Sequence, residues 1–406
     1  KGNIIPTAVV GESRSKHPII APTNVQASRI NVAAFNASGV NNSVVSKEDT
    51  WEGRVGSIPF KKWKAAVAYH NGNVFMFGGF RGDNINPSVD TLVYNIKGDV
   101  WNIFTKPVIN TSFTLIGGGN FLPLSLLKGV FPVDLAITQT VNNVTMVRWD
   151  TDRQPLPIQL HSATAHTVKD KIYVIGGVDI LQQQNYHVFE YDTIADTWRT
   201  FADIFRAANE SIVGLPAVVR GGKIYVFGKQ IHIYNTINNS LASGNVSTRR
   251  EWAAYALSGD NVYIAGGGTS AGVPLADVSI YNITSGVWAN GKPLPVPVTG
   301  LQGGAIIDQK FYIMGGHDGL NFVRNNQIYD IALDDYVADA APVTQGLGHH
   351  NYLSVTDNPA SVDFGVYVFG GTRDFFQGQR TVFKYNPFQS AMQAQGIGKY
   401  TIGTEV

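Results

Sequence analysis

A repeated pairing of an aromatic residue with Asn or Asp is the feature that most constrains the fold. These pairs recur at intervals of 42 to 56 residues: Tyr94-Asn95, Trp149-Asp150, Tyr191-Asp192, Tyr234-Asn235, Tyr281-Asn282, Tyr329-Asp330 and Tyr385-Asn386. Seven residues after each aromatic stands a large apolar side chain: Trp101, Leu156, Trp198, Leu241, Trp288, Tyr336 and Met392. A period in this range indicates a chain built by repeating one supersecondary unit.

Upstream of most of these pairs lies a short run of β-branched and aromatic residues that ends in glycine. The runs occupy residues 74–79, 172–177, 224–228, 262–267, 311–316 and 366–371. A run without polar alternation is typical of a strand buried on both faces. The paired glycines at its end permit positive φ angles and close approach of neighbouring backbones.

Each unit is therefore predicted to hold four strands in about 49 residues, and no unit can bury both of its faces alone. Sheets of this kind that pack radially form a β-propeller. A single Gly-Gly or Tyr-Asp pair would equally suit a turn in an unrelated sandwich, but units in register along the whole chain exclude that alternative.

The units resemble the Kelch repeat, in which a hydrophobic strand ends in Gly-Gly and is followed by a spaced Tyr and Trp. The resemblance covers residues 57 to 395 and implies an all-β, seven-bladed Kelch-type β-propeller. Two units depart from the pattern. Gly228 is followed by Lys229, and residues 102 to 157 keep only Trp149-Asp150 and Leu156. WD-repeat propellers fit less well, because Trp149-Asp150 is the only such dipeptide.

Residues 1 to 56 and 396 to 406 fall outside the repeats. The first segment is predicted to be an extended N-terminal arm that lies on its own propeller, closes it with a strand, or docks on a neighbouring copy. Residues 31 to 46 are candidates for an outer strand of the last blade, and the C-terminal residues for a strand or tail. The arm residues predicted to drive self-assembly are Ile4, Ile5, Val9, Val10, Ile19 and Ile20.

Composition narrows the class of protein. Cysteine is absent, which excludes disulfides and thiolate metal sites. The net charge of +1 argues against an ordinary nucleic-acid-binding surface, and no stretch suits a membrane span. Eight Asn-x-Ser/Thr sequons in a chain with only 15% charged residues favour an extracellular glycoprotein whose signal peptide has been removed. The candidate asparagines are Asn36, Asn41, Asn110, Asn143, Asn209, Asn238, Asn245 and Asn282.

The Kelch resemblance implies that partners bind where loops follow the glycine pairs and precede the first strand of each unit. The residues at these positions carry mixed charges, so they create no field of one sign. The predicted ligand or partner face consists of Lys62, Arg81, Asp83, Asp179, Lys229, Arg250, Glu251, His317, Asp318, Arg373 and Asp374. Ordinary solvated loops are an equally good interpretation of these residues.

Catalytic signatures are missing from the sequence. It has no nucleophile elbow, P-loop or dinucleotide fingerprint, and its nine histidines lack the spacing of a metal site. Copper-radical oxidases with a Kelch-like propeller use a cysteine cross-linked to tyrosine, so the absence of cysteine excludes them. No catalytic residue, metal or cofactor is predicted.

The sequence thus favours a secreted, non-enzymatic Kelch propeller that acts as an interaction or structural module, with protein partners or copies of itself. The alternative is a carbohydrate-binding or carbohydrate-active protein that uses the same loop face. In that case Asp83, Asp179, Asp318 and Asp374 would have to converge for acid–base chemistry. An intracellular Kelch adaptor is a third hypothesis, which a glycan on any sequon would exclude.

Overall fold

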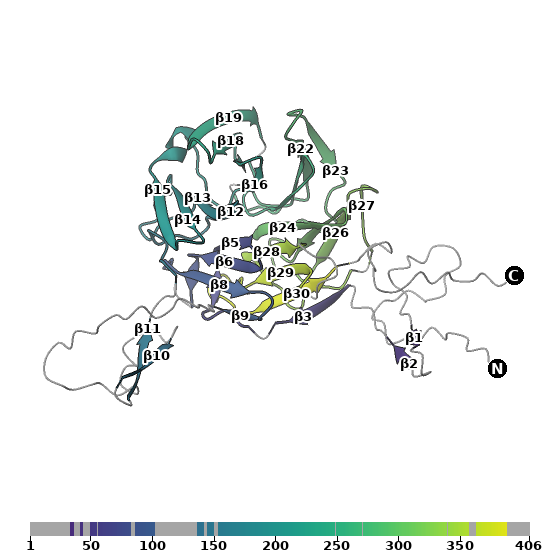
Figure 1. Cartoon of the computed structure of the whole chain (residues 1–406). Coiled ribbons are helices and arrows are strands. Elements are labelled where there is room, and N and C mark those ends of the chain that lie inside the picture. Colours follow the sequence, from purple (N-terminus) through teal and green to yellow (C-terminus); the bar gives the residue numbers. More distant parts are fainter. Residues whose placement is uncertain are drawn as a thin grey trace. The chain divides into compact units, whose positions relative to one another are not determined.

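The computed structural model describes most of the repeat region (Figure 1). The described residues are 33–35, 41–43, 49–54, 56–82, 86–101, 136–141, 144–149, 153–247, 249–269, 271–338, 340–356 and 363–387. Within these ranges the only helix is a short 3-10 helix, η2 (Ile204–Ala208), so the all-β prediction is confirmed. The chain divides into two units, one formed by residues 55–249 and 370–380 and the other by the remainder.

The unit that contains residues 55–249 holds three four-stranded antiparallel sheets. The first sheet consists of β5 (Ala66–His70), β6 (Asn73–Phe77), β8 (Thr91–Asn95) and β9 (Val100–Trp101). The second consists of β12 (Thr164–Val168), β13 (Lys171–Ile175), β14 (Val188–Asp192) and β15 (Thr197–Phe201). The third consists of β16 (Ala217–Arg220), β17 (Lys223–Phe227), β18 (Gln230–Asn235) and β19 (Ser240–Val246). A short pair, β4 (Lys62–Trp63) and β7 (Phe80–Arg81), accompanies the first sheet.

The other unit also holds three such sheets, whose inner strands lie next to one another through parallel pairs. The fourth sheet consists of β20 (Ala254–Ser258), β21 (Asn261–Ala265), β22 (Val278–Asn282) and β23 (Trp288–Gly291). The fifth consists of β24 (Leu301–Ile307), β25 (Lys310–Met314), β26 (Asn326–Asp330) and β27 (Asp335–Tyr336). The sixth consists of β28 (His350–Val355), β29 (Gly365–Phe369), β30 (Val382–Asn386) and β3 (Thr50–Gly53).

The second strand of each sheet forms the core, as its lack of polar alternation predicts. In β13, Ile172, Val174 and Ile175 have no exposed surface. The glycine pair that follows is needed for two reasons: the backbone has a positive φ, and there is no room for a side chain. Gly79 has φ +77°, and a Cβ there would lie 2.8 Å from the backbone of Ala65. A side chain at this position would therefore push apart the loop and the first strand.

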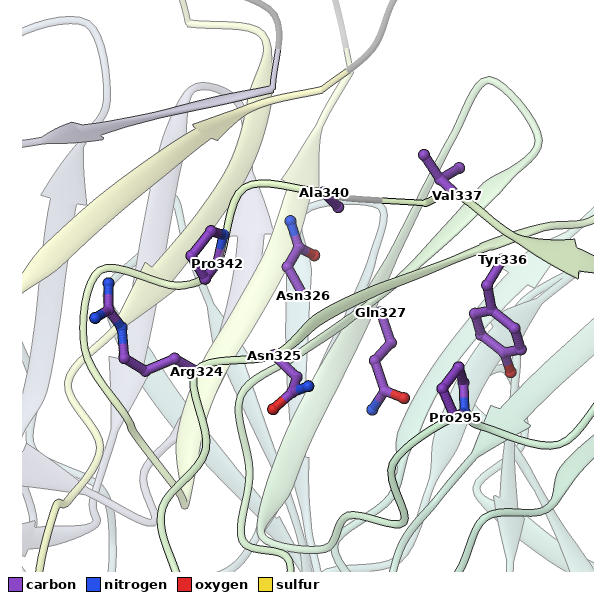
Figure 2. Close-up of a pocket in the computed structure, with 9 residues that line it drawn as sticks. All are labelled: Pro295, Arg324, Asn325, Asn326, Gln327, Tyr336, Val337, Ala340 and Pro342. Atoms are coloured by element: carbon purple, nitrogen blue, oxygen red, sulfur yellow. The ribbon is translucent and has the colours of Figure 1, made fainter. Parts of the chain in front are cut away.

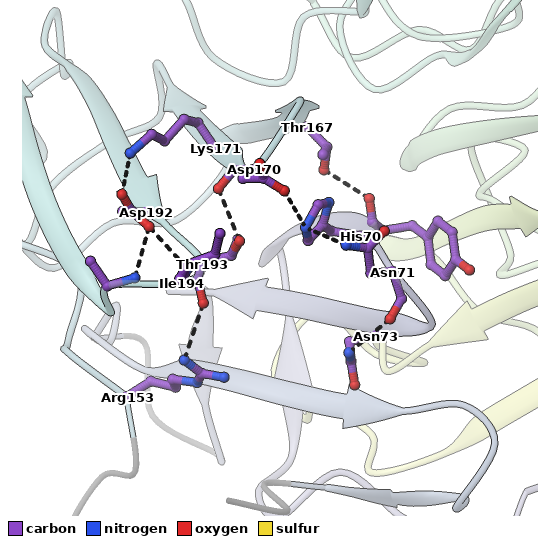
Figure 3. Close-up of polar contacts among 12 residues, drawn as sticks. His70, Asn71, Asn73, Arg153, Thr167, Asp170, Lys171, Asp192, Thr193 and Ile194 are labelled. Carbon is purple, nitrogen blue, oxygen red and sulfur yellow. Dashed lines mark hydrogen bonds and ion pairs between the residues drawn. The ribbon is translucent and has the colours of Figure 1, made fainter. Parts of the chain in front are cut away.

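The seven-bladed count is not what the described residues show, because they form six such sheets. The first and second sheets pack directly against each other: the Gly79 N–H donates to the Leu160 carbonyl at 2.7 Å. At their edges, the Thr167 hydroxyl donates to the Tyr69 carbonyl at 2.8 Å, as Figure 3 shows. The residues predicted to form a blade between them lie mostly outside the described residues. Their described part, β10 (Ala136–Val141) and β11 (Val144–Trp149), is a hairpin paired only with itself.

A clasp of three side chains closes the outer edge of the second sheet. Tyr191 donates its hydroxyl to the Asp196 carboxylate at 2.6 Å, and its ring lies 4.8 Å from that of Trp198. The same carboxylate accepts the Gln154 N–H at 3.0 Å, and the Trp198 indole donates to the Gln154 carbonyl at 2.9 Å. The clasp thus fastens the segment that leads into the sheet. Equivalent tyrosine–turn pairs are Tyr94–Asp99, Tyr234–Asn239 and Tyr329–Asp334.

In the sixth sheet the clasp is completed from the other end of the chain. Tyr385 donates to the Asp49 carboxylate at 2.8 Å, and its ring centroid lies 5.0 Å from that of Trp51. Trp51 therefore occupies the position that the seven-residue spacing assigned to Met392, which lies outside the described residues. The outer strand is β3, and not residues 31 to 46. Within that stretch, β1 (Ala33–Phe35) and β2 (Asn41–Ser43) pair with each other.

The remainder of both flanking segments lies outside the described residues. This applies to all of the predicted assembly-arm residues, Ile4, Ile5, Val9, Val10, Ile19 and Ile20, and to residues 396 to 406. The arm and the tail therefore stay predictions.

Candidate functional site

The loops that follow the glycine pairs contain most of the residues predicted to bind a partner. Three of their carboxylates hold their own loops together. Asp179 accepts the N–H groups of Leu181 and Gln183, both at 2.8 Å. Asp318 and Asp374 do the same in the fifth and sixth sheets, where each accepts two backbone N–H groups at 2.7 to 3.0 Å. These are Asx turns, in which a carboxylate replaces a backbone acceptor.

Each of these turns exposes an apolar side chain two residues after its aspartate. Leu181 is 72% exposed, Leu320 is 87% exposed and Phe376 is 69% exposed. The fourth sheet uses a hydroxyl in the same way: the Thr269 Oγ1 accepts the Val273 N–H at 3.4 Å, and Val273 is exposed. In the first sheet the sequence Asp83-Asn84-Ile85 repeats the spacing, but these residues lie outside the described residues. The loops therefore use their polar groups internally and present apolar tips.

Lys62 was predicted to face a partner, and this prediction is wrong. Its side chain is 1% exposed and its ammonium group contacts Gly78 O at 2.8 Å, Ser88 Oγ at 2.6 Å and Asp90 Oδ2 at 2.5 Å. Burial opposes the charge on both ionic groups, yet Lys62 holds the pKa of Asp90 below its usual range. The pair joins the turn before β5 to the loop after β6, so its role is structural.

Arg250 is buried in a corresponding place, four residues before β20 as Lys62 is before β5. Its guanidinium donates to the Asp277 carbonyl at 2.8 Å and contacts Ser279 Oγ. Both cations were predicted to lie on the surface because their acceptors stand 16 to 29 residues later in the chain.

The other predicted face residues are only partly available. The Arg81 guanidinium lies 3.4 Å from the Phe60 ring centroid. The His317 ring lies 5.0 Å from that of Phe322, and its Nδ1 accepts the Gly319 N–H. Glu251 is half-buried and pairs through its backbone with Gly268. Lys229 and Arg373 are exposed, and Asp83 lies outside the described residues.

A buried ionic cluster in the third sheet was missed. Glu210 receives hydrogen bonds from His232 at 2.6 Å, from Arg249 at 2.8 Å and from the Lys229 N–H at 2.8 Å. Burial alone would raise the pKa of Glu210, but these bonds lower it to about 2. The cluster lies at the unit in which Lys229 replaces the second glycine of the repeat. This departure from the pattern was the one sequence feature that could have pointed to it. No three His, Asp or Glu side chains are grouped for metal binding in the described ranges.

The sequon asparagines differ in how exposed they are to solvent. Asn209, Asn238 and Asn245 are exposed, all in or beside the third sheet. Asn282 is half-buried and committed: it donates to Asn261 at 2.8 Å and accepts the Ser285 N–H at 2.8 Å. Asn41 lies in β2, and Asn36, Asn110 and Asn143 lie outside the described residues. In the part of the chain that is described, no helix is long and apolar enough for a bilayer.

Comparisons with known proteins agree with the repeat. The Kelch motif matches residues 159–203, which contain the second sheet. The Kelch-like protein terF of Aspergillus terreus is 26% identical over 173 residues, 39% of this chain and 36% of that protein. The spermatocyte protein spe-26 of Caenorhabditis elegans is 25% identical over 199 residues, 45% of this chain and 33% of that protein. The match thus spans about a third of each relative.

A solved structure shows the same fold. The structure of YjhT superposes with a TM-score of 0.55 at 14% sequence identity, covering 80% of this chain and 96% of that one. Identity this low carries the fold and nothing more. The solved structure thus shows the β-propeller fold, and the repeated glycine pairs, the tyrosine clasps and the motif matched at residues 159–203 support a propeller of the Kelch-repeat kind.

Proposed function

We propose that this protein is a protein-interaction module whose partners bind the loops after the glycine pairs. The observation that carries the proposal is the set of pinned apolar tips at Leu181, Leu320 and Phe376. An apolar side chain on a loop that is already ordered loses little conformational entropy on binding. A few anchors, most often aromatic or arginine side chains, supply most of the affinity in protein interfaces, and Phe376 is the tip of that kind.

The carbohydrate-active alternative has less support. Backbone hydrogen bonds from their own loops lower the pKa of Asp318 and Asp374. A general acid needs a raised pKa, so these carboxylates are poor proton donors at neutral pH. Carbohydrate binding without catalysis remains the second candidate, because the adjacent exposed rings of Phe375 and Phe376 offer a surface for stacking.

The turns at the opposite end of the sheets are a natural comparison for these loops. They also expose apolar side chains, at Ile194, Ile237 and Leu333. The loop end differs in two respects. It adds the aromatic pair at Phe375 and Phe376, and in one unit two of its loops meet, since a Cβ on Gly319 would lie 3.6 Å from Pro274.

The test compares the two ends directly. Peptides are selected from a displayed library against the full chain, and their binding is then measured to two triple variants. Leu181→Ser, Leu320→Ser and Phe376→Ser remove the loop tips; Ile194→Ser, Ile237→Ser and Leu333→Ser are the matched control. We expect the loop variant to lose at least about tenfold in affinity and the control to lose none. Equal loss in both variants, or the absence of any enriched peptide, contradicts the proposal.

Secretion and self-assembly belong to the same proposal. The exposure of Asn209, Asn238 and Asn245 supports glycosylation in an extracellular protein, and the apolar runs near residues 4–10 and 19–25 support an assembly arm. Mass spectrometry of the protein from its natural source tests the first. Native mass of the full chain beside one lacking residues 1–28 tests the second. Unmodified asparagines or an unchanged particle size would remove the respective part of the proposal.

A further inference from the structure

A cavity of about 330 Å³ lies beside β26, where the outer strand of the fifth sheet is cut short (Figure 2). The outer strand β27 pairs only with Tyr329 and Asp330, and one further bond joins the Val337 N–H to the Ile328 carbonyl at 2.8 Å. In the second sheet, by contrast, all five residues of β14 are paired with the outer strand. In the fifth sheet the start of β26 therefore has no partner in the outer strand.

The chain returns to this edge only at Val343, whose N–H donates to the Arg324 carbonyl at 2.8 Å. Between these two points, Val337, Ala340 and Pro342 line the cavity. Ala341 is held by the segment that contains the closing strand: its N–H donates to Asp49 at 2.7 Å, and its carbonyl accepts the Trp51 indole N–H at 3.1 Å. The cavity therefore has a built wall on the side away from β26.

Most polar groups that line the cavity are used to build it. Gln327 clamps the Val296 backbone with two hydrogen bonds, at 2.8 and 2.9 Å. The Tyr336 hydroxyl donates to the Lys292 carbonyl at 2.9 Å. Asn326 is only 7% exposed; its amide donates to Ala341 O, while its Oδ1 has no hydrogen-bond partner among the described residues.

Arg324 supplies the charge at one end of the cavity. Its Nε donates to the Val343 carbonyl at 2.8 Å, which orients the guanidinium. Its two terminal nitrogens have neither an ion pair nor a hydrogen bond within the described part of the chain, and the side-chain amide of Asn325, the next residue, has none there either. A planar guanidinium held in this way matches the geometry of a carboxylate.

We propose that this cavity binds a small polar ligand that carries a carboxylate, held by Arg324, and a second polar group, held by the side-chain amide of Asn325. Pro295, Tyr336 and Val337 provide apolar walls for its carbon skeleton. The volume suits a ligand of about the size of one sugar or one amino-acid residue. A free sugar acid and an acidic side chain of a peptide both have this chemistry. The site is separate from the loop tips, so neither proposal depends on the other.

The test titrates the full chain with two matched pairs of probes, followed by ligand-observed NMR and calorimetry. Glucuronate is compared with glucose, and N-acetylglutamate amide with N-acetylglutamine amide. We expect saturable binding of at least one charged probe, about tenfold or more tighter than that of its neutral partner. Binding of the sugar acid alone identifies a free small molecule, and binding of the glutamate probe alone identifies a peptide; either supports the site.

Two variants connect that binding to the cavity. Arg324→Gln removes the charge from an exposed side chain and should weaken the charged probe about tenfold or more. Arg199→Gln removes an exposed arginine of β15, which belongs to neither proposed site, and should leave binding unchanged. Absence of binding by both charged probes at millimolar concentration, or equal binding by wild type and Arg324→Gln, overturns the proposal.

Discussion

The second and sixth sheets make the same clasp from differently connected pieces of chain. In the second sheet, Tyr191, Asp196 and Trp198 lie within eight consecutive residues; in the sixth, Tyr385 meets Asp49 and Trp51 from the far end of the sequence. The tyrosine–carboxylate distances are 2.6 and 2.8 Å, and the ring centroids are 4.8 and 5.0 Å apart. Even the turn conformation agrees, with φ of 56° at Asp196 and 53° at Asp49.

This agreement shows that side-chain chemistry, and not chain connectivity, determines how an outer strand is attached. The difference lies in what the attachment costs. The clasp of the second sheet closes a turn of a few residues, whereas that of the sixth brings together segments more than three hundred residues apart, and the entropy lost on closing a loop grows with its length. The attachment of the outer strand should therefore contribute less net free energy in the sixth sheet than in the second, even where the individual contacts are equally strong.

Removing residues 1–53 should have the largest effect, because it deletes the clasp of the sixth sheet and leaves that of the second sheet intact. The sixth sheet would lose its outer strand, the Trp51 contacts and the Asp49 hydrogen bonds. We expect a loss of about 5 kcal/mol in the free energy of unfolding, from apolar burial and hydrogen bonds together. Urea denaturation measures the loss, and a chain that begins at residue 46 is the control. Equal midpoints for the two truncated chains would show that β3 contributes nothing in solution.

Single tryptophan substitutions sharpen the comparison. Trp51 and Trp198 are both half-buried, and each indole donates to a backbone carbonyl. Trp51→Ala and Trp198→Ala should each lower the free energy of unfolding by about 2 kcal/mol. The matched variants Trp51→Phe and Trp198→Phe retain a ring and should lose about half as much. If Trp198→Ala is destabilising and Trp51→Ala is not, the two clasps are not equivalent.

Much of this architecture could be predicted from the sequence, because periodicity reports local packing. The buried second strands, the glycine pairs and the Tyr–Trp spacing all repeat within one unit. Closure by a strand of the N-terminal segment was one of the predicted alternatives, but its position at residues 50–53 was not predicted. The signal was present, because Asp49-Thr50-Trp51 has the same Asp-x-Trp pattern as Asp196-Thr197-Trp198. Counting seven residues forward from Tyr385 gave Met392 instead. Such spacing compares residues that are close in sequence, so it does not identify Trp51, which comes from the other end of the chain.

The seventh blade that the spacing predicted is not confirmed by the described residues. Trp149-Asp150 and Leu156 fit the spacing, but spacing says nothing about which segments touch. Leu156 is buried among residues of the first two sheets, and its N–H donates to the Val89 carbonyl at 2.9 Å. It therefore belongs to the segment that enters the second sheet. Likewise, Lys62 can be buried because it pairs with Asp90, and no pattern in the sequence links these two residues.

Alkaline pH offers a test of both clasps at once. Burial and the hydrogen bond to Asp196 raise the pKa of Tyr191, and burial and the charge of Asp49 raise that of Tyr385. The folded chain therefore keeps these protons where the unfolded chain loses them, at a pH of about 10. Stability should be constant below that pH and fall above it, by about 1.4 kcal/mol per pH unit for each tyrosine.

Tyrosine-to-phenylalanine variants show how much each tyrosine contributes to this pH dependence. Tyr191→Phe and Tyr385→Phe should each reduce the slope of stability against pH by the contribution of one tyrosine, as measured by urea denaturation between pH 9 and 11. A slope unchanged in Tyr385→Phe alone would mean that the sixth clasp is open at high pH while the second is closed.

The smallest expected effect concerns the charge of the turn residue. The third sheet already has an amide in this position: Asn239 accepts the Tyr234 hydroxyl at 2.7 Å with φ of 57°. Asn tolerates a positive φ and keeps an acceptor oxygen, so Asp49→Asn and Asp196→Asn should each cost about 0.5 kcal/mol.

Alanine in the same two positions separates the acceptor from the charge. Asp49→Ala and Asp196→Ala lose the bonds to the tyrosine hydroxyl and to the entering backbone N–H, and they place an ordinary side chain at positive φ. Each should cost about 2 kcal/mol in urea denaturation. If the Asn variants were as unstable as the Ala variants, the carboxylate charge would hold the clasp, and the amide in the third sheet would need a different explanation. A small cost for Asn beside a large one for Ala means that an acceptor oxygen in a left-handed turn is sufficient, whichever end of the chain provides it.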